Sequence, residues 1–163
     1  MEEEKISGLD ELRKEYSILA KKYDLPGFSE LNKTFDIEEI DSDTEFLLRR
    51  VRRVVSGRIE IYLRFIEIIL NPANAPMFFF KLIKKLEEDD KKQLTVIYED
   101  FGKLELNAIK LDLKYDEEKE AEFVKNVYKI FNEKISGELL MAVKKMGNGE
   151  GNVKKESKGS YFG

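Results

Sequence analysis

Apolar side chains recur every three or four residues through almost the whole chain, and this spacing constrains the fold more than any other feature of the sequence. Such spacing places apolar residues along one face of an α-helix. The alternation of apolar and polar residues that marks a half-buried strand is not convincing over any stretch. The sequence therefore predicts an all-α protein.

Prolines, glycines and capping residues divide this pattern into separate helices. Leu25-Pro26-Gly27 ends the first helix, Asn71-Pro72 ends the second, and Asp116 is placed to cap the last. We predict an antiparallel helical bundle of three long helices, with a short connecting helix inside it and an N-terminal helix packed alongside. The long helices span about residues 44–70, 90–113 and 117–146, the connecting helix 76–87 and the N-terminal helix 8–23.

The composition changes at Gly147, where the segment GNGEGNVKKESKGSYFG begins and holds five of the ten glycines of the chain. Such a segment buries too little apolar surface to offset the entropy lost on ordering it. A chain of 163 residues suits one domain. We therefore expect a single helical-bundle domain over residues 1–146 and a flexible, disordered C-terminal tail over 147–163.

The chain contains neither cysteine nor histidine. The lack of cysteine excludes disulfides, thiolate metal sites and cysteine nucleophiles. The lack of histidine excludes the commonest general base, imidazole metal ligands and every Ser-His-Asp triad. Carboxylates alone do not complete the Glu-x-x-His pattern of di-iron bundles. We expect no cofactor, no metal site and no enzymatic activity.

Acidic and basic residues nearly balance, with 33 Asp and Glu against 29 Lys and Arg and a formal net charge of -4. A balanced surface argues against a broad affinity for nucleic acids or membranes. No window approaches the 18 or so consecutive apolar residues of a membrane span. The N-terminal segment MEEEKISGLDE is acidic and lacks the apolar core of a signal peptide. We expect a cytoplasmic protein without a transmembrane segment.

Six of the seven arginines lie in the expected helix 44–70, within LLRRVRRVVSGRIEIYLR. One interpretation is an anion-binding surface for phosphate or nucleic acid, formed by Arg49, Arg50, Arg52 and Arg53. The other is a solvated face braced by pairs four residues apart, such as Glu60–Arg64. Patterned charge on a helix is most often a solvated face, so the second interpretation is favoured.

Arg58 differs from the other arginines because its helical angle places it in the middle of the apolar stripe. A buried guanidinium requires a carboxylate partner, since an unpaired charge there would cost several kcal/mol, about 3–5. Glu105 falls within the apolar arc of the helix 90–113, as Asp112 does, and Glu105 and Arg58 both lie near the midpoints of their helices. We predict a buried Arg58–Glu105 ion pair that specifies the fold.

The last helix carries a second apolar row beside its main stripe, formed by Phe123, Ile130 and Met141. Two apolar rows indicate either two helical neighbours within the chain or one neighbour outside it. At the C-terminus, Tyr161 and Phe162 follow several lysines and could anchor in a pocket of a partner. These five residues are the candidate interaction residues.

Two long stretches resemble a group of small, functionally uncharacterised archaeal all-helical proteins. They are LLRRVRRVVSGRIEIYLRFIEIILNPANAP and DDKKQLTVIYEDFGKLELNAIKLDLKYDEEKEAEFVKNVYKIF. In that group, too, an Arg/Lys-rich helix ends at Asn-Pro or Gln-Pro and a helix that starts with AEF comes last. The long basic helix followed by two more helices is faintly similar to the helical domain of GINS replication-scaffold subunits. The first resemblance implies the helical fold and no particular activity.

The sequence thus favours a non-enzymatic protein-interaction or scaffold bundle, whose partner is a protein, either a second copy or another chain. The alternative function is the binding of a nucleic acid or a phosphate ligand through the arginine-rich helix 44–70. The two hypotheses use different surfaces of the bundle, so the positions of these side chains in the fold bear on both.

Overall fold

The computed structural model describes the backbone of residues 2–156 and the side chains of residues 8–148. Every regular element in residues 2–156 is helical, which confirms the prediction of an all-α protein. The elements follow one another along the chain as α1 (Glu2–Tyr23), α2 (Phe28–Phe35), α3 (Leu47–Leu70), η1 (Pro72–Asn74), α4 (Met77–Ile83), α5 (Glu88–Leu113), α6 (Glu117–Ile130), η2 (Phe131–Ile135) and α7 (Ser136–Glu156).

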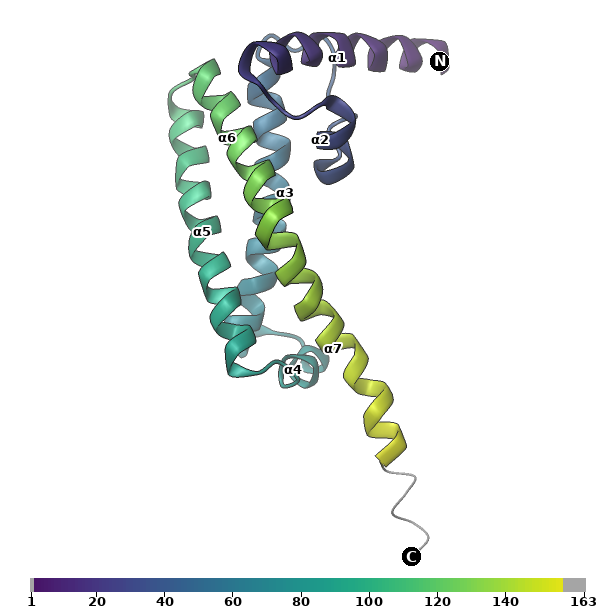
Figure 1. Ribbon diagram of the computed structural model, residues 1–163, viewed down its shortest axis with the longest axis vertical. Helices are drawn as coiled ribbons and strands as arrows, with labels where there is room; N and C mark the ends of the chain where they lie inside the picture. Colours follow the sequence, from purple (N-terminus) through teal and green to yellow (C-terminus); the bar gives the residue numbers. More distant parts are fainter. Residues whose placement is uncertain (1, 157–163) are drawn as a thin grey trace, which may run out of the picture.

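Three long rods form the body of the molecule (Figure 1). α3 and α5 run in opposite directions, and α6 returns alongside both and continues through η2 into α7. α3 packs against α5 and α6 through its apolar stripe, in which Val51, Val55, Ile59 and Ile66 are buried. The buried apolar side chains of the described residues form one continuous core.

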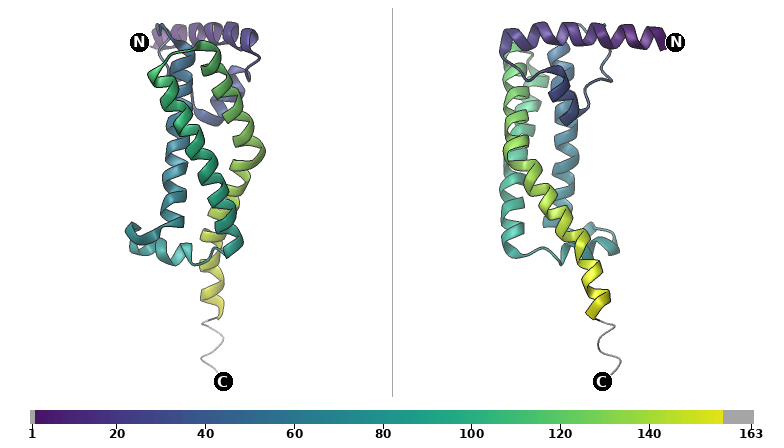
Figure 2. Two further views of the ribbon diagram at one scale, coloured as in Figure 1. Left: turned by 90° about the vertical axis from the view of Figure 1, so that its left-hand side faces the viewer. Right: turned by 45° about the vertical axis from the view of Figure 1, so that its right-hand side comes forward.

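The N-terminal helices close one end of the bundle. α1 lies across the rods in each of the views in Figures 1 and 2, and α2 packs between α1 and α3. The Tyr16 hydroxyl donates a hydrogen bond of 2.7 Å to the Pro26 carbonyl, which fixes the turn between the two helices. α1 ends at Asp24, whose φ of 54° is left-handed, and the Leu25 N–H donates to the Ala20 carbonyl at 2.9 Å. This backbone pattern is the Schellman ending of a helix.

The helix boundaries follow the expected capping chemistry in two places. The Asp116 side chain accepts a hydrogen bond from the Lys119 N–H at 3.1 Å, so the predicted cap of the last helix is confirmed. α5 begins with a capping box, in which Glu87 and Asp90 bond reciprocally to each other's backbone N–H groups. α3 begins at Leu47, slightly later than the expected residue 44, and no side chain caps it.

The last rod, formed by α6, η2 and α7, differs in two ways from the single helix expected over residues 117–146. Residues Phe131–Ile135 form a π-helical turn, η2, which keeps both Phe131 and Ile135 buried. The helical backbone then continues through α7 to Glu156, beyond Gly147, the first residue of the expected glycine-rich tail. Glycine is tolerated in a helix at a cost of about 1 kcal/mol per residue, so a glycine-rich sequence does not forbid this continuation. Residues 157–163 lie outside the described part.

No helix within residues 2–156 is both long enough and apolar enough to cross a membrane.

Candidate functional site

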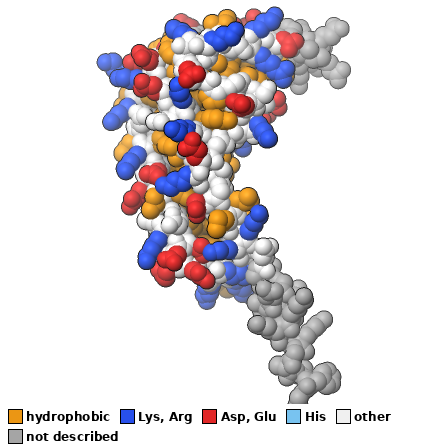
Figure 3. Space-filling view, viewed as in Figure 1, with side chains coloured by type: hydrophobic (Ala, Val, Ile, Leu, Met, Phe, Trp, Pro, Cys, Tyr) orange, Lys and Arg blue, Asp and Glu red, His pale blue; other side chains and the backbone are white. Residues whose placement is uncertain are grey.

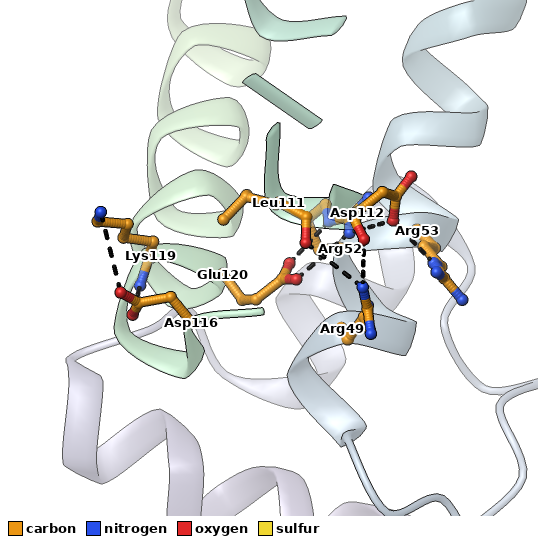
Figure 4. A network of polar contacts seen from close by, with 8 residues as sticks. All are labelled: Arg49, Arg52, Arg53, Leu111, Asp112, Asp116, Lys119 and Glu120. Carbon is orange, nitrogen blue, oxygen red and sulfur yellow. Dashed lines mark hydrogen bonds and ion pairs between the residues drawn. The ribbon is translucent and has the colours of Figure 1, made fainter. Parts of the chain in front are cut away.

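The most buried charged group of the bundle is an ion pair between α3 and α6. The Arg52 Nε donates to Glu120 Oε2 at 2.7 Å, and the Arg52 Nη2 donates to Glu120 Oε1 at 3.3 Å. The exposed fractions of the two side chains are 1% and 0%. The second Nη2 bond, 2.6 Å to Asp112 Oδ1, extends the network to the end of α5 (Figure 4). The guanidinium therefore ties α3 to both of its neighbours.

Two further arginines of α3 complete this network. The Arg53 Nε donates to the same Asp112 Oδ1 at 3.1 Å. The Arg49 Nη2 donates to the Asp112 carbonyl at 2.7 Å, in the last turn of α5 where carbonyls lack helical partners. The Arg49 guanidinium also lies 5.7 Å from the centre of the Tyr115 ring. Positive charge at this C-terminal helix end is favoured by the helix dipole.

The pKa directions in this network agree with its geometry. The Arg52 guanidinium, followed by that of Arg53, lowers the pKa of the Asp112 carboxyl, although partial burial opposes the shift. Burial by itself would lower the pKa of Arg52, but the hydrogen bonds to Glu120 and Asp112 outweigh burial and raise it. The opposite charges of Asp112 and Arg52 thus hold each other in the ionised form, so this pair stabilises the end of the bundle.

A second polar cluster fastens α1 to the start of α6. Glu117 accepts hydrogen bonds from the Tyr23 hydroxyl and, at 3.1 Å, from the Lys22 ammonium. The Tyr23 hydrogen bond and then Lys22 lower the pKa of Glu117. A surface pair of 2.9 Å between Lys125 and Asp24 joins α6 to the end of α1. These contacts position the N-terminal helix across the bundle.

The predicted buried pair Arg58–Glu105 is wrong. The Arg58 side chain is 44% exposed, and its Nη2 donates to the Asp36 carboxylate at 3.0 Å, while Glu105 is exposed on α5. The side of α3 that carries Arg58 faces α2 and the segment after it, which leave the guanidinium open to water. α5 and α6 cover the side that carries Arg52, so Arg52 is the buried arginine and Glu120 and Asp112 are its partners.

The four arginines proposed as an anion-binding surface do not face the solvent together. Arg52 is buried, and Arg49 and Arg53 bond to the end of α5 as described above. Of these four, all within the described residues, only Arg50 has neither an ion pair nor a side-chain hydrogen bond. Together with Arg49 and Arg53 it lines a hollow of about 560 Å³, whose lining also includes the acidic side chains of Asp41, Asp43 and Glu45. Acidic and basic side chains are likewise interspersed over the face drawn in Figure 3.

The predicted interaction row on the last helix is wrong as a continuous surface. Phe123 is 3% exposed and belongs to the core, because α6 lies against both α3 and α5. Ile130 is half-buried and packs against the same core, and only Met141 is well exposed. The second apolar row therefore serves a second neighbour within the chain. Tyr161 and Phe162 lie outside the described residues.

The outer face of α5 carries an apolar surface that is absent from the residues predicted for interaction. Leu106, Ile109 and Leu113 are 63%, 50% and 84% exposed, although all three are large aliphatic side chains. Their spacing of three and then four residues places them on one side of α5, together with Gly102. We call these four residues the α5 seam. The signal was present in the sequence, since the 3–4 spacing is that of a helix-binding stripe.

A cavity of about 350 Å³ lies beside the α5 seam, between α3 and α5. Its apolar lining includes Ile59, Ala108 and Phe123, and Ile109 of the seam contributes to its rim. The Ser56 hydroxyl, which also lines it, is buried and has no hydrogen-bond partner in the described structure. The cavity also has charged side chains in its lining, among them Arg53, Glu60 and Glu105, and Ile109 is the seam residue that it shares.

The described residues contain no cluster of three or more acidic side chains with the geometry of a metal site. Glu120 and Asp112 are engaged by guanidinium groups and do not present free oxygen ligands. Comparisons with protein-family models, with curated proteins and with solved structures find no match to this chain. The geometry of its own surfaces is therefore the basis for the functional argument.

Proposed function

We propose that this chain is a protein-interaction module that binds an α-helix of its partner along the α5 seam. The observation that carries the proposal is the exposure of Leu106, Ile109 and Leu113 on one side of a helix whose other side is buried in the core. Helices that dock on one another use apolar anchors three and four residues apart, and the seam has this spacing. A contiguous exposed apolar stripe with a polar rim is typical of a protein-binding surface.

The side chains around the α5 seam support its interpretation as a docking face. Lys103 and Lys110 border the seam on one side, and Glu105 and Asp112 border it on the other, so polar residues surround an apolar centre. Protein interfaces commonly have this arrangement of a buried apolar centre and a polar rim. The adjoining cavity between α3 and α5 offers room for side chains of a docked helix.

A capture experiment with matched variants tests the proposal. The bait is the purified full chain, presented both to a lysate of its source cells and to a differently tagged copy of itself. The test variant Leu106→Ser/Ile109→Ser removes two anchors of the seam, and Leu140→Ser removes a 54%-exposed leucine from α7 as the control. We expect a protein that the native chain and the control retain and the seam variant loses. Equal capture by all three, with native circular dichroism spectra, would refute the proposal.

A further inference from the structure

We infer that the partner helix is α5 of a second copy of this chain, aligned parallel to the first. This inference rests on the proposed interaction through the α5 seam and specifies its occupant. Three observations support it: the heptad positions of the seam, the charges that border it and the lack of partners for two of those charges within the described residues.

The seam fits the heptad pattern of paired helices. Taking Leu106 and Leu113 as the a positions places Gly102 and Ile109 at the d positions. In a parallel pair, equivalent a and d residues of the two copies meet in layers, so Leu106 contacts its own counterpart and Ile109 does the same. Gly102 lets the two backbones approach closely at the start of the seam.

The charges beside the seam distinguish parallel from antiparallel pairing. Glu105 and Asp112 occupy g positions, and Lys103 and Lys110 occupy e positions. In a parallel pair the g residue of one helix lies beside the e residue of the next heptad on the other helix, which matches Glu105 with Lys110 of the second copy. Symmetry produces this contact twice. An antiparallel pair would instead place acidic g beside acidic g and lysine beside lysine.

These charges are available for contacts between copies. Glu105 and Lys110 are both exposed, and within the described residues neither forms an ion pair or a side-chain hydrogen bond with its own chain. Asp112, in contrast, is already paired with Arg52 and Arg53. Among the charges beside the seam that the described residues leave unpaired, Glu105 and Lys110 are the two of opposite sign that a parallel copy would bring together.

The surroundings of α5 favour two copies over a higher number. The buried side of α5 faces α3 and α6, which leaves one narrow apolar side for a single neighbour. The contact uses the same side of α5 in both copies, so it closes at two copies.

Charge exchange tests the inference on the full chain. Lys110→Glu places the introduced carboxylate of one copy beside Glu105 of the other, and Glu105→Lys places two ammonium groups together in the same way. Each single variant replaces two attractive contacts by two repulsive ones, so we expect the dimer to weaken about 10-fold at low salt. A mixture of the two single variants pairs every acid with a base, and we expect it to associate at least as tightly as the native chain.

The measurement is sedimentation velocity at low salt over protein concentrations from about 10 µM to 1 mM. Strengthened association by Lys110→Glu alone would indicate antiparallel pairing and overturn the inference. A native chain that remains monomeric over this range would also overturn it. A monomeric native chain would leave the proposed function standing if the capture experiment still yields a partner that depends on the seam. The proposed function fails when the capture experiment yields no such partner, so the two failures are distinguishable.

Discussion

Replacing Glu120 with leucine should destabilise the protein by removing the buried partner of Arg52. Both side chains are almost completely inaccessible, and the Arg52 Nε loses its 2.7 Å bond to the carboxylate. Removal of one partner from a buried ion pair costs about 3–5 kcal/mol, because the remaining charge has little solvent around it. Asp112 still accepts a bond from the Arg52 Nη2, so the expected loss is at the lower end, about 3 kcal/mol.

For a chain of this size, each kcal/mol changes the melting temperature by about 2–4 °C, so Glu120→Leu should lower it by roughly 6–12 °C. Urea unfolding followed by far-ultraviolet circular dichroism measures the free energy directly. The dependence of that free energy on urea should not change, because the surface exposed on unfolding is nearly the same. An exposed pair serves as the control: Arg64→Met removes the surface pair Arg64–Glu60 and should cost less than about 1 kcal/mol.

The double variant Arg52→Met/Glu120→Leu separates the cost of an orphaned charge from the value of the pair itself. It replaces both buried charges by apolar groups of similar size, a change that is often neutral or stabilising in proteins. We therefore expect the double variant to be more stable than Glu120→Leu alone. A loss below about 1 kcal/mol for Glu120→Leu, or a double variant less stable than Glu120→Leu, would refute the reasoning.

Three further predictions follow from the same structure. Arg52 and Arg53 lower the pKa of Asp112 in the folded protein. The ionised Asp112 therefore stabilises the fold fully at a pH above about 4, its ordinary pKa, and this stabilisation is lost as the pH falls through the lower pKa of the folded state. The melting temperature of Asp112→Asn should accordingly be below that of the native chain at pH 7, and this difference should shrink as the pH falls below about 4, as measured by thermal unfolding. In a Lys125→Met background, which lacks the surface pair with Asp24, Asp24→Gly should raise the free energy of unfolding in urea by about 0.5–1 kcal/mol, because glycine adopts the left-handed conformation without steric cost; an unchanged or lower value would contradict this. Phe123→Asp should prevent cooperative unfolding or lower stability by more than about 3 kcal/mol, whereas Met141→Asp should be tolerated, and equal stabilities would place Phe123 at the surface.

The helices and several of their ends were predictable because their causes are local in the sequence. The Asn71-Pro72 step ends α3, and the Asp116 side chain caps α6, as the residue types alone indicate. The π-turn at Phe131–Ile135 had no such local signal. It keeps both of these residues in the core while the rod passes from one set of neighbours to another, and this requirement comes from tertiary packing.

The identity of the buried arginine could not be read from helical angles. Arg58 is nearer the middle of the apolar stripe than Arg52, yet Arg52 is the buried one. A helical angle gives the direction of a side chain and not the number of elements that cover that direction. On α3, the flank towards α5 and α6 is covered by two long helices, while the side of Arg58 is covered by a short helix and a loop. The carboxylates on the covering helices, Asp112 and Glu120, decide which guanidinium is paired.

The same limitation explains why the exposed apolar row lies on a different helix from the one expected. α6 carries two apolar rows and has two neighbours within the chain, so Phe123 is buried by internal packing. α5 packs against α3, α6 and α7, and its buried stripe from Leu94 to Ala108 and Leu111 already serves these neighbours. Leu106, Ile109 and Leu113 are then apolar residues that the described part of the chain leaves uncovered. A candidate interaction surface is thus an apolar row that remains exposed after the neighbours of a helix have covered its other apolar residues. α5 carries such a row, whereas the second row of α6 is largely covered.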